Sequence, residues 1–216
     1  MRGEAPIFWD VDTQWDFIQP AGKLYVTGSE SIVGTLARLT SFAHERGIRV
    51  IASADDHVAG HRELSATPDY RTTFPDHCIR GTPGQQKIME TALRNPMIIE
   101  PAPVDPAALA ARVLAHDGDI LFHKHWFDVF TNPNVLPVVD ALAPARIVLY
   151  GVALDVCDRY AVEGLLAQRP GIPLVVVTDA VRAIDPEAGA RLLADWSTRG
   201  VTLASADQIL TELSRS

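Results

Sequence analysis

Short apolar runs rich in valine and isoleucine recur along this chain, and stretches with helical spacing separate most of them. The runs lie at residues 7–11, 48–54, 97–100, 119–124, 146–151, 173–180 and 201–205. The clearest helical stretches lie at 30–46, 105–116, 134–143, 155–168 and 186–199. Strands that alternate with helices predict βαβ units and a mainly parallel sheet. Because the runs are apolar on both faces, we expect helices on both sides and a three-layer, doubly wound α/β fold.

The chain has 216 residues, of which 47% are hydrophobic, so it can bury a sizeable core. No repeat, low-complexity tract or linker interrupts the alternating pattern, so we predict a single domain over residues 1–216. Residues 55–96 differ in composition, because they hold many polar residues, Gly and Pro and no long periodic segment. So long an irregular stretch in a compact domain is more often functional than idle.

The net charge and the cysteine content indicate which kinds of partner and which cellular compartment this chain is expected to have. The formal net charge of −8 argues against a nucleic-acid surface or a basic membrane patch, since both need clustered Lys and Arg. No apolar run approaches the roughly 20 residues that span a bilayer, and the N-terminus lacks a signal-peptide pattern. Two cysteines, Cys78 and Cys157, are too few for a disulfide-stapled secreted scaffold. We expect a cytoplasmic protein with free thiols that acts on a small molecule.

Chemically useful side chains follow several predicted strands at the point where each strand ends. Asp12 lies at the end of the first run, directly after its last residue, and Asp55 and His57 lie just past the second. Lys124 ends the fourth run, and Cys157 follows the fifth by a short turn. Because ligands of open parallel sheets bind at the carboxyl ends of the strands, these residues are expected to share one edge and form a site.

Cys157 lies in the first turn of a predicted helix. The helix dipole and the unpaired N–H groups of that turn favour a reactive thiolate, and the same N–H groups can hold an oxyanion. The alternative is a small buried apolar residue, which is common for cysteine. Asp155 and Asp158 flank the cysteine, and nearby negative charge raises the pKa of a thiol. A nucleophilic cysteine here therefore needs a positive partner.

Lys124 is a candidate for that partner, although a lysine at a strand end often extends to water instead. The segment around the first strand end contains three acids, Asp10, Asp12 and Asp16. A carboxylate between a cysteine and a lysine can accept the thiol proton and later donate it to a leaving amine. The alternative is an acid that caps a turn. The residues alone do not decide which of the three acids has the catalytic role.

The irregular segment carries a candidate metal site. Asp55 and His57 form an Asp-x-His pair, and His77 follows in the same segment. One carboxylate and two imidazoles suit zinc or iron(II) with positions left open for water or substrate. An isolated Asp-x-His pair is also common in surface loops. Asp56 and His61 are spare candidates.

Taken together, these segments resemble the nicotinamidase branch of the isochorismatase-like cysteine hydrolases. The matching pieces occur in the family's order and cover most of the chain. They are VDTQWDF (11–17), ADDHVAGH (54–61), FPDHCIRGTPG (74–84), Lys124 and GVALDVC (151–157).

The resemblance implies a catalytic triad of Asp12, Lys124 and Cys157. It also implies a cis peptide bond between Val152 and Ala153, and an oxyanion hole formed by the N–H groups of Ala153 and Cys157. In this family two aromatic rings hold the substrate ring.

The residues that match those rings are Phe17 and Phe74, and Val152 is a further substrate contact. Phe74 stands where relatives usually have Trp, and Asp158 stands where they are commonly apolar. The metal ligands that the resemblance implies are Asp55, His57 and His77. In some relatives a further His or acid downstream of the Asp-x-His pair also ligates, and His61 is a candidate for that fourth position.

We therefore expect a metal-containing cysteine amidohydrolase that releases ammonia from a small, nicotinamide-like amide through a thioester. The alternative within the family is a hydrolase of another small amide or of a ureido or carbamoyl compound, such as a maleamate-like one. Arg80 and Arg159 lie near the motifs in sequence and could bind the carboxylate of such a substrate. A nucleotide-dependent oxidoreductase is disfavoured, because no Gly-rich turn follows the first strand. Since relatives are often dimers or larger, we expect a homo-oligomer, in which residues 126–130 serve a subunit contact or a pocket wall.

Overall fold

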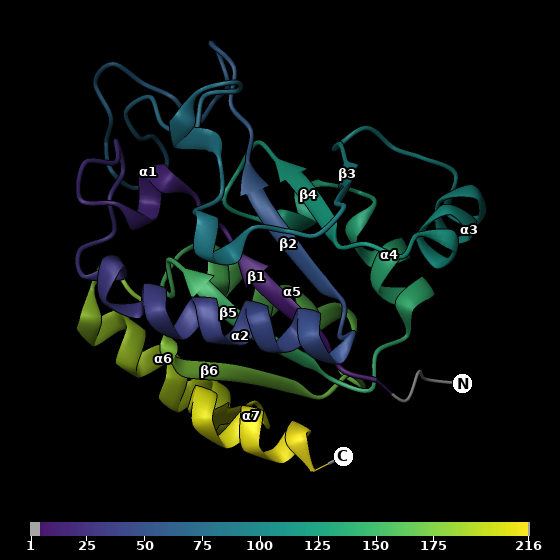
Figure 1. Cartoon of the computed structure of the whole chain (residues 1–216). Helices are drawn as coiled ribbons and strands as arrows, with labels where there is room; N and C mark the ends of the chain where they lie inside the picture. The colour runs from purple at the N-terminus through teal and green to yellow at the C-terminus, as the bar shows by residue number, and fades with distance from the viewer. Residues whose placement is uncertain (1–4, 216) are drawn as a thin grey trace.

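A computed structural model describes residues 5–215, and within them seven parallel strands form one sheet (Figure 1). The strand order is β3-β4-β2-β1-β5-β6-β7. Each apolar run of the sequence coincides closely with one strand, so the predicted doubly wound α/β fold is confirmed. The strands are β1 Ile7–Val11, β2 Val50–Asp55, β3 Met97–Ile99, β4 Ile120–Lys124, β5 Ile147–Val152, β6 Leu174–Arg182 and β7 Thr202–Ala204.

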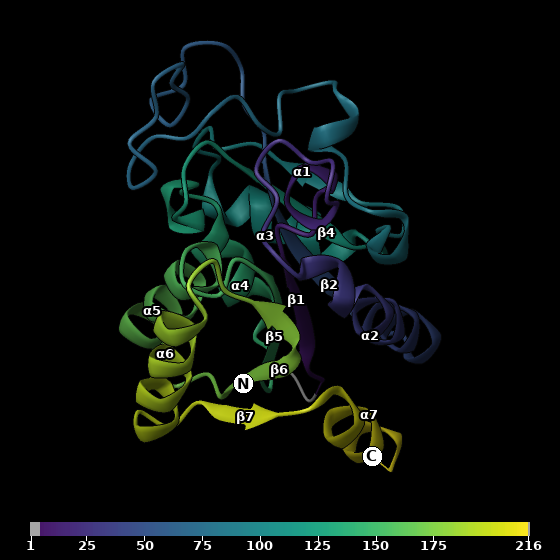
Figure 2. The ribbon, with the colours of Figure 1, turned by 90° about the vertical axis from the view of Figure 1, so that its left-hand side faces the viewer.

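Helices cover both faces of the sheet (Figure 2). On one face the sheet packs against α3 Pro106–Ala115, α4 Val135–Leu142, α5 Cys157–Gln168 and α6 Pro186–Thr198. On the other face it packs against α2 Val33–Arg46 and α7 Ala206–Ser214. Short helices are α1 Trp15–Ile18, η1 Ser29–Ile32, η2 Pro83–Gln85, η3 Met89–Thr91 and η4 Val129–Thr131. No helix within residues 5–215 is long and apolar enough to cross a membrane.

Local capping residues set where several helices begin. Asp105 and Asp185 cap α3 and α6 with their carboxylates, and a proline follows each of them at the first helical position. Helix α7 lies outside the predicted helical stretches, yet its start carries a local signal. Ser205 and Gln208 form a capping box, in which each side chain bonds to the other residue's backbone N–H.

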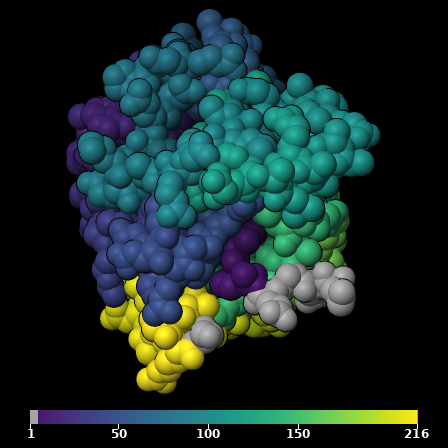
Figure 3. Space-filling view, turned by 45° about the vertical axis from the view of Figure 1, so that its right-hand side comes forward, coloured from purple at the N-terminus to yellow at the C-terminus, as the bar shows by residue number. Residues whose placement is uncertain are grey.

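The strand order places a binding edge at the carboxyl ends of β1 and β5. Strand β1 pairs with β2 on one side and with β5 on the other, so the chain's path across the sheet reverses there. Ligands of doubly wound folds bind at such a switch point. Residues 56–87 lie over this edge, at the top of the molecule in Figures 1 and 3, and residues 88–96 run back beside α2 to the start of β3. Apart from η2 and η3 they form isolated bridges, such as Leu64 with Phe74 and His57 with Ile79.

Candidate active site

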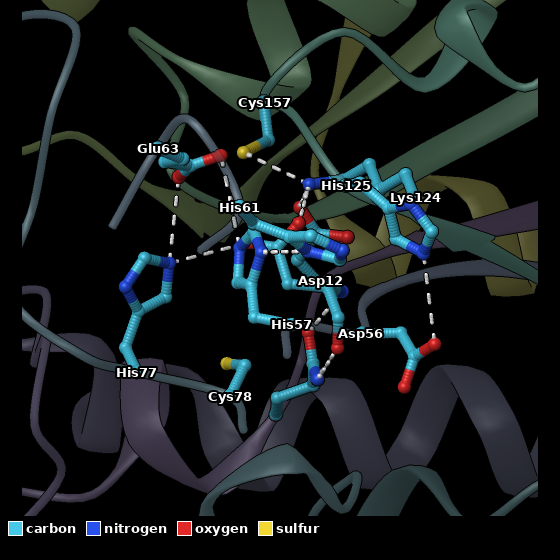
Figure 4. Close-up of polar contacts among 12 residues, drawn as sticks. Asp12, Asp56, His57, His61, Glu63, His77, Cys78, Lys124, His125 and Cys157 are labelled. Carbon is cyan, nitrogen blue, oxygen red and sulfur yellow. Dashed lines mark hydrogen bonds and ion pairs between the residues drawn. The ribbon is translucent and has the colours of Figure 1, made fainter. Parts of the chain in front are cut away.

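Three side chains from three strand ends meet at the carboxyl edge of the sheet (Figure 4). Asp12 follows β1, Lys124 is the last residue of β4, and Cys157 begins α5 after β5. The Lys124 Nζ lies 2.9 Å from Asp12 Oδ2 and 3.7 Å from Cys157 Sγ. The structure thus brings the three predicted triad residues together around the lysine ammonium.

The three acids near the end of β1 have separate partners. Asp10 forms an ion pair with Lys87, with Nζ and Oδ2 2.9 Å apart. The Asp16 carboxylate accepts the backbone N–H of Cys78 at 2.7 Å, which is a structural contact. Of the three, Asp12 is the acid that contacts Lys124. The geometry therefore favours Asp12, the residue that the resemblance implied.

Lys124 is fully buried, and two carboxylates compensate its charge. Its ammonium pairs with Asp12 and also with Asp55. Burial by itself lowers the pKa of a lysine, but Asp12 and Asp55 outweigh burial and raise the pKa of Lys124 well above its usual range. Burial likewise raises the pKa of Asp55, but Lys124, His57 and His77 outweigh it and hold that pKa well below its usual value. Lys124 is therefore a fixed positive charge at neutral pH.

Cys157 occupies the first position of α5, but its resting sulfur is a thiol. Burial raises the pKa of Cys157 well above its usual value, and Asp12 and Asp55 raise it further, while Lys124 acts in the opposite direction. The helix N-terminus by itself favours thiolate, whereas burial and the two carboxylates favour the thiol. The Cys157 sulfur must therefore lose its proton during the reaction. Asp12 is placed to accept it, because Asp12 and Cys157 both contact Lys124.

The two acids that flank the cysteine behave differently from each other. Asp155 accepts the backbone N–H groups of Ile184 and Asp185, both at 2.8 Å. Asp158 is fully buried, and neither of its oxygens has a hydrogen-bond partner within residues 5–215. Burial, assisted by nearby carboxylates such as Asp12, raises the pKa of Asp158 well above its usual value. Burial of Asp158 accordingly favours its protonated form, which does not oppose ionisation of Cys157.

A buried cluster beside the triad has ligand atoms close enough together to share one metal ion: Asp55, His57, Glu63 and His77. His77 Nε2 lies 3.4 Å from Glu63 Oε1 and 3.6 Å from Asp55 Oδ2. His57 Nε2 lies 3.7 Å from Glu63 Oε2 and 3.8 Å from Asp55 Oδ2. Ligands about 2.1 Å from a tetrahedral zinc lie roughly 3.4 Å apart, so these spacings suit a metal.

Unpartnered atoms in this cluster point to the same conclusion. Both histidine Nε2 atoms and the Glu63 Oε2 are buried without a hydrogen-bond partner within residues 5–215. Buried polar atoms rarely lack partners, and a metal ion would satisfy all three. Burial lowers the pKa of His77, but the neighbouring carboxylates of Asp55 and Glu63 outweigh it and raise the pKa to about 10. The nitrogen and oxygen ligands fit zinc or iron(II).

At the fourth ligand position the structure differs from the prediction, because Glu63 rather than His61 joins the cluster. The His61 ring packs against His57 and His125, and its Nδ1 lies 3.2 Å from His57 Nδ1. The loop folds back through a bridge beside Glu63, whose carbonyl accepts the N–H of Phe74 at 2.8 Å. An acidic residue downstream of the Asp-x-His pair was the available signal in the sequence.

Asp56 belongs to a separate group. Arg80 Nε donates to both of its carboxylate oxygens, at 2.9 and 3.0 Å. His123 and His125 lie 3.5 and 3.7 Å from the same carboxylate. Asp56, Glu100 and His123 are also close enough together to hold a metal, but the guanidinium already compensates the charge of Asp56 and disfavours a cation there.

A cavity of about 280 Å³ opens above the triad and the metal cluster. The predicted substrate contacts Phe17, Phe74 and Val152 all line it, together with Cys157. Phe127 also lines it and packs edge-on against Phe74, with ring centroids 5.6 Å apart, so part of the segment 126–130 serves as a pocket wall. Among the residues that the structure describes, the lining contains no Lys, Arg or His.

The candidate oxyanion hole lies at the turn between β5 and α5. The Val152–Ala153 peptide bond is cis, as the resemblance implied. Within residues 5–215 the backbone N–H groups of Ala153 and Cys157 make no turn or side-chain hydrogen bond, and both residues line the cavity. These two donors are thus free to meet a bound oxygen, which is what an oxyanion hole requires.

Residues 8–208 of this chain match the family model for the isochorismatase domain. The chain belongs to the isochorismatase family. Its membership agrees with the parallel sheet and with the site at the carboxyl ends of β1 and β5. The match covers nearly all of the described residues, including every residue of the triad and of the metal cluster.

Nicotinamidases are among the proteins that this chain resembles in sequence and fold. The chain is 27% identical over 200 residues to the nicotinamidase/pyrazinamidase of Mycobacterium tuberculosis, with 89% of this chain and 95% of that protein covered. It is 25% identical over 194 residues to a probable inactive nicotinamidase of Arabidopsis thaliana, with 88% and 87% covered.

The structure superposes with a TM-score of 0.70 on the pyrazinamidase of Pyrococcus horikoshii, solved in complex with zinc, at 23% identity and with 93% and 98% covered. The prediction of a nicotinamidase-like hydrolase of amide C–N bonds is confirmed at the level of family and class. Because one relative is named as inactive, the chemistry of this chain has to be argued from its own site.

Proposed function

We propose that this chain hydrolyses a small, neutral aromatic amide of the nicotinamide type to the acid and ammonia, through a thioester on Cys157. The observation that supports this most is the position of Lys124. Its ammonium lies 2.9 Å from Asp12 and 3.7 Å from Cys157, and Cys157 lines a cavity with aromatic walls. A nucleophile, a base and a fixed positive charge are the groups that covalent amide hydrolysis needs.

In the acylation step, Asp12 takes the proton of the Cys157 thiol as the sulfur attacks the amide carbonyl carbon. Lys124 stabilises the negative charge that forms on the sulfur. The N–H groups of Ala153 and Cys157 donate to the carbonyl oxygen as it becomes an oxyanion. Asp12 then donates the proton to the departing nitrogen, the C–N bond breaks, and ammonia leaves behind a thioester.

In the second step, water attacks the thioester carbon while Asp12 accepts one of its protons. Collapse of the intermediate breaks the C–S bond, releases the carboxylic acid and restores the Cys157 thiol. Asp55, His57, Glu63 and His77 would hold a divalent metal, zinc or iron(II), which when bound supplies a Lewis acid for water or for a ring nitrogen. Phe17 and Phe74 place the substrate ring by packing against it.

The cavity lining favours a neutral aromatic substrate over a carboxylate-bearing one. Arg80 is paired with Asp56, and the Arg159 guanidinium lies over the ring of Tyr160. Neither arginine lines the cavity, and the carboxylates of Asp55 and Glu63 do. A maleamate-like substrate would bring a carboxylate, and no Lys, Arg or His side chain of the described residues lines the cavity to receive it. The ureido or carbamoyl alternative receives no specific support from this lining.

The proposal is tested by measuring ammonia release from nicotinamide with the metal-loaded chain. Cys157→Ala should abolish release, while Cys78→Ala, which replaces the other buried cysteine away from the cavity, should retain it. Mass spectrometry of an acid-quenched reaction should show a nicotinoyl adduct in the peptide that contains Cys157. Ammonia release by Cys157→Ala near the rate of the unmodified chain would show that the nucleophile is assigned incorrectly.

A further inference from the structure

The mouth of the cavity is bordered by exposed apolar side chains. Tyr70 and Ile184 line the cavity, and they are 65% and 53% exposed. Leu24 and Val156, both half-buried, continue the same border. An exposed apolar group gains free energy when it is covered, and clusters of such groups mark binding sites. We call these four residues the apolar rim.

The apolar rim is attached to the catalytic elements. Ile184 donates its backbone N–H to Asp155, two residues before the nucleophile. The neighbouring N–H of Asp185 occupies the other oxygen of that carboxylate. On the opposite chain segment, the Tyr70 ring packs edge-on against Phe74, with ring centroids 6.3 Å apart. The rim therefore keeps a defined position relative to Cys157, as a specificity site requires.

The chemistry of this region suits an apolar group. Tyr25 also lines the cavity, but its hydroxyl is occupied by Glu30 and by the N–H of Gly28, so its ring is the part left for contact. At about 280 Å³ the cavity approaches the lower end of the range for drug-sized ligands, about 300 Å³. A single pyridine ring with its carboxamide is smaller than such ligands, so a cavity of this size has room for a further substituent.

We propose that the apolar rim is a specificity subsite for an uncharged, apolar substituent on the acyl group of the substrate. The subsite deepens the proposed function and rests on it for the position of the amide at Cys157. It makes alkyl- or aryl-substituted pyridine carboxamides better ligands than nicotinamide itself. It also disfavours a substituent of the same length that ends in a carboxylate, because the rim offers apolar side chains and no basic side chain to receive the charge.

Binding and turnover are measured separately. Calorimetry with Cys157→Ala should show that 5-butylnicotinamide binds more tightly than nicotinamide, by up to roughly fourfold for each methylene that becomes buried. A nicotinamide whose 5-substituent is a carboxylate-terminated chain of similar length should bind more weakly than nicotinamide. Equal affinity for the butyl compound and nicotinamide overturns the subsite. Tighter binding without ammonia release from the unmodified chain supports the subsite and overturns the proposed function.

Substitutions at the rim test whether Ile184 and Tyr70 contact the substituent. Ile184→Asn and Tyr70→Ser should each reduce the butyl-to-nicotinamide affinity ratio by at least threefold, and the two together by more. Ile98→Asn is the matched control, because Ile98 is 50% exposed on the edge strand β3 and lies outside the cavity. It should leave the ratio unchanged. If the rim variants keep the unmodified ratio and melt at the same temperature as the control, the rim does not contact the substituent.

Discussion

Lys124 shows how single residues set the charge of this site. A buried ammonium is costly unless it is paired, and here Asp12 and Asp55 pair with it from two different strand ends. One of these carboxylates belongs to the triad and the other to the metal cluster. The lysine therefore links the two groups electrostatically. Removing it would leave two carboxylates buried beside Cys157 without a compensating charge.

The contribution of Glu63 to metal binding can be separated from that of the nearby His61. Glu63→Gln removes a charged oxygen from the cluster, so the affinity for zinc should fall at least tenfold. His61→Asn removes a ring that contacts His57 from outside the cluster, so the loss should be smaller. Competition with a chromophoric chelator measures both affinities. A larger loss in His61→Asn than in Glu63→Gln would return the fourth position to His61.

Asp158 should make the stability of the chain depend on pH in a defined direction. Its pKa in the folded chain lies well above the ordinary value of 3.8, so between these values the native state keeps a proton that the unfolded state has lost. The free energy of unfolding therefore falls as pH rises, by up to about 1.4 kcal/mol per pH unit from this group.

Asp158→Asn removes that titration. Urea unfolding at pH 5 and pH 7 should show that the variant gains stability relative to the unmodified chain as pH rises. If the two chains differ in free energy of unfolding by the same amount at pH 5 and at pH 7, Asp158 is ionised in the native state.

At the scale of elements, α5 has to hold Cys157 at the carboxyl edge while packing closely against η4. Gly164 makes this approach possible, because a Cβ at that position would lie 2.1 Å from the Phe130 ring. Phe130 belongs to η4 and packs edge-on against Trp9 of β1, so the ring cannot move freely. The position of the nucleophile helix is thus set partly by the absence of a side chain.

Gly164→Ala should destabilise the chain by about 1–3 kcal/mol, although alanine is ordinarily the better helix former. The steric overlap with Phe130 outweighs the better helix propensity of alanine, so the free energy of unfolding should fall. Gly34→Ala is the control, because nothing lies within 4 Å of a Cβ at this exposed position in α2, and it should stabilise by up to about 1 kcal/mol. Denaturant unfolding measures both. A stabilising Gly164→Ala would show that η4 yields easily to α5.

In the molecule as a whole, the metal cluster joins the end of β2 to the irregular segment over the carboxyl edge. Asp55 belongs to β2, whereas His57, Glu63 and His77 belong to the segment 56–96. A metal ion that binds these four residues therefore ties the least regular part of the chain to the sheet.

Three expectations for the whole molecule stay predictions: the homo-oligomer, the cytoplasmic compartment and the single domain over residues 1–216.

Metal binding should consequently stabilise the whole chain. A free metal concentration of 100 times the dissociation constant stabilises the native state by about 2.7 kcal/mol. For a chain of this size that corresponds to a melting temperature roughly 5–10 °C higher. Calorimetric scans with zinc and with excess chelator measure the shift, and His77→Ala should remove most of it. An identical melting temperature under both conditions would contradict a metal at this cluster.

The sequence by itself determined the parallel sheet and the edge at which the site lies, because alternating apolar runs and strand-end residues are local patterns. It also named Asp12, Lys124 and Cys157 as partners, through their positions and the family resemblance. Only the tertiary structure decided that Glu63 joins the metal cluster and that the pKa of Asp158 is raised. The first depends on how an irregular loop folds back on itself, and the second on burial by distant segments. Neither property is contained in local spacing, because contacts between residues far apart in the chain produce both.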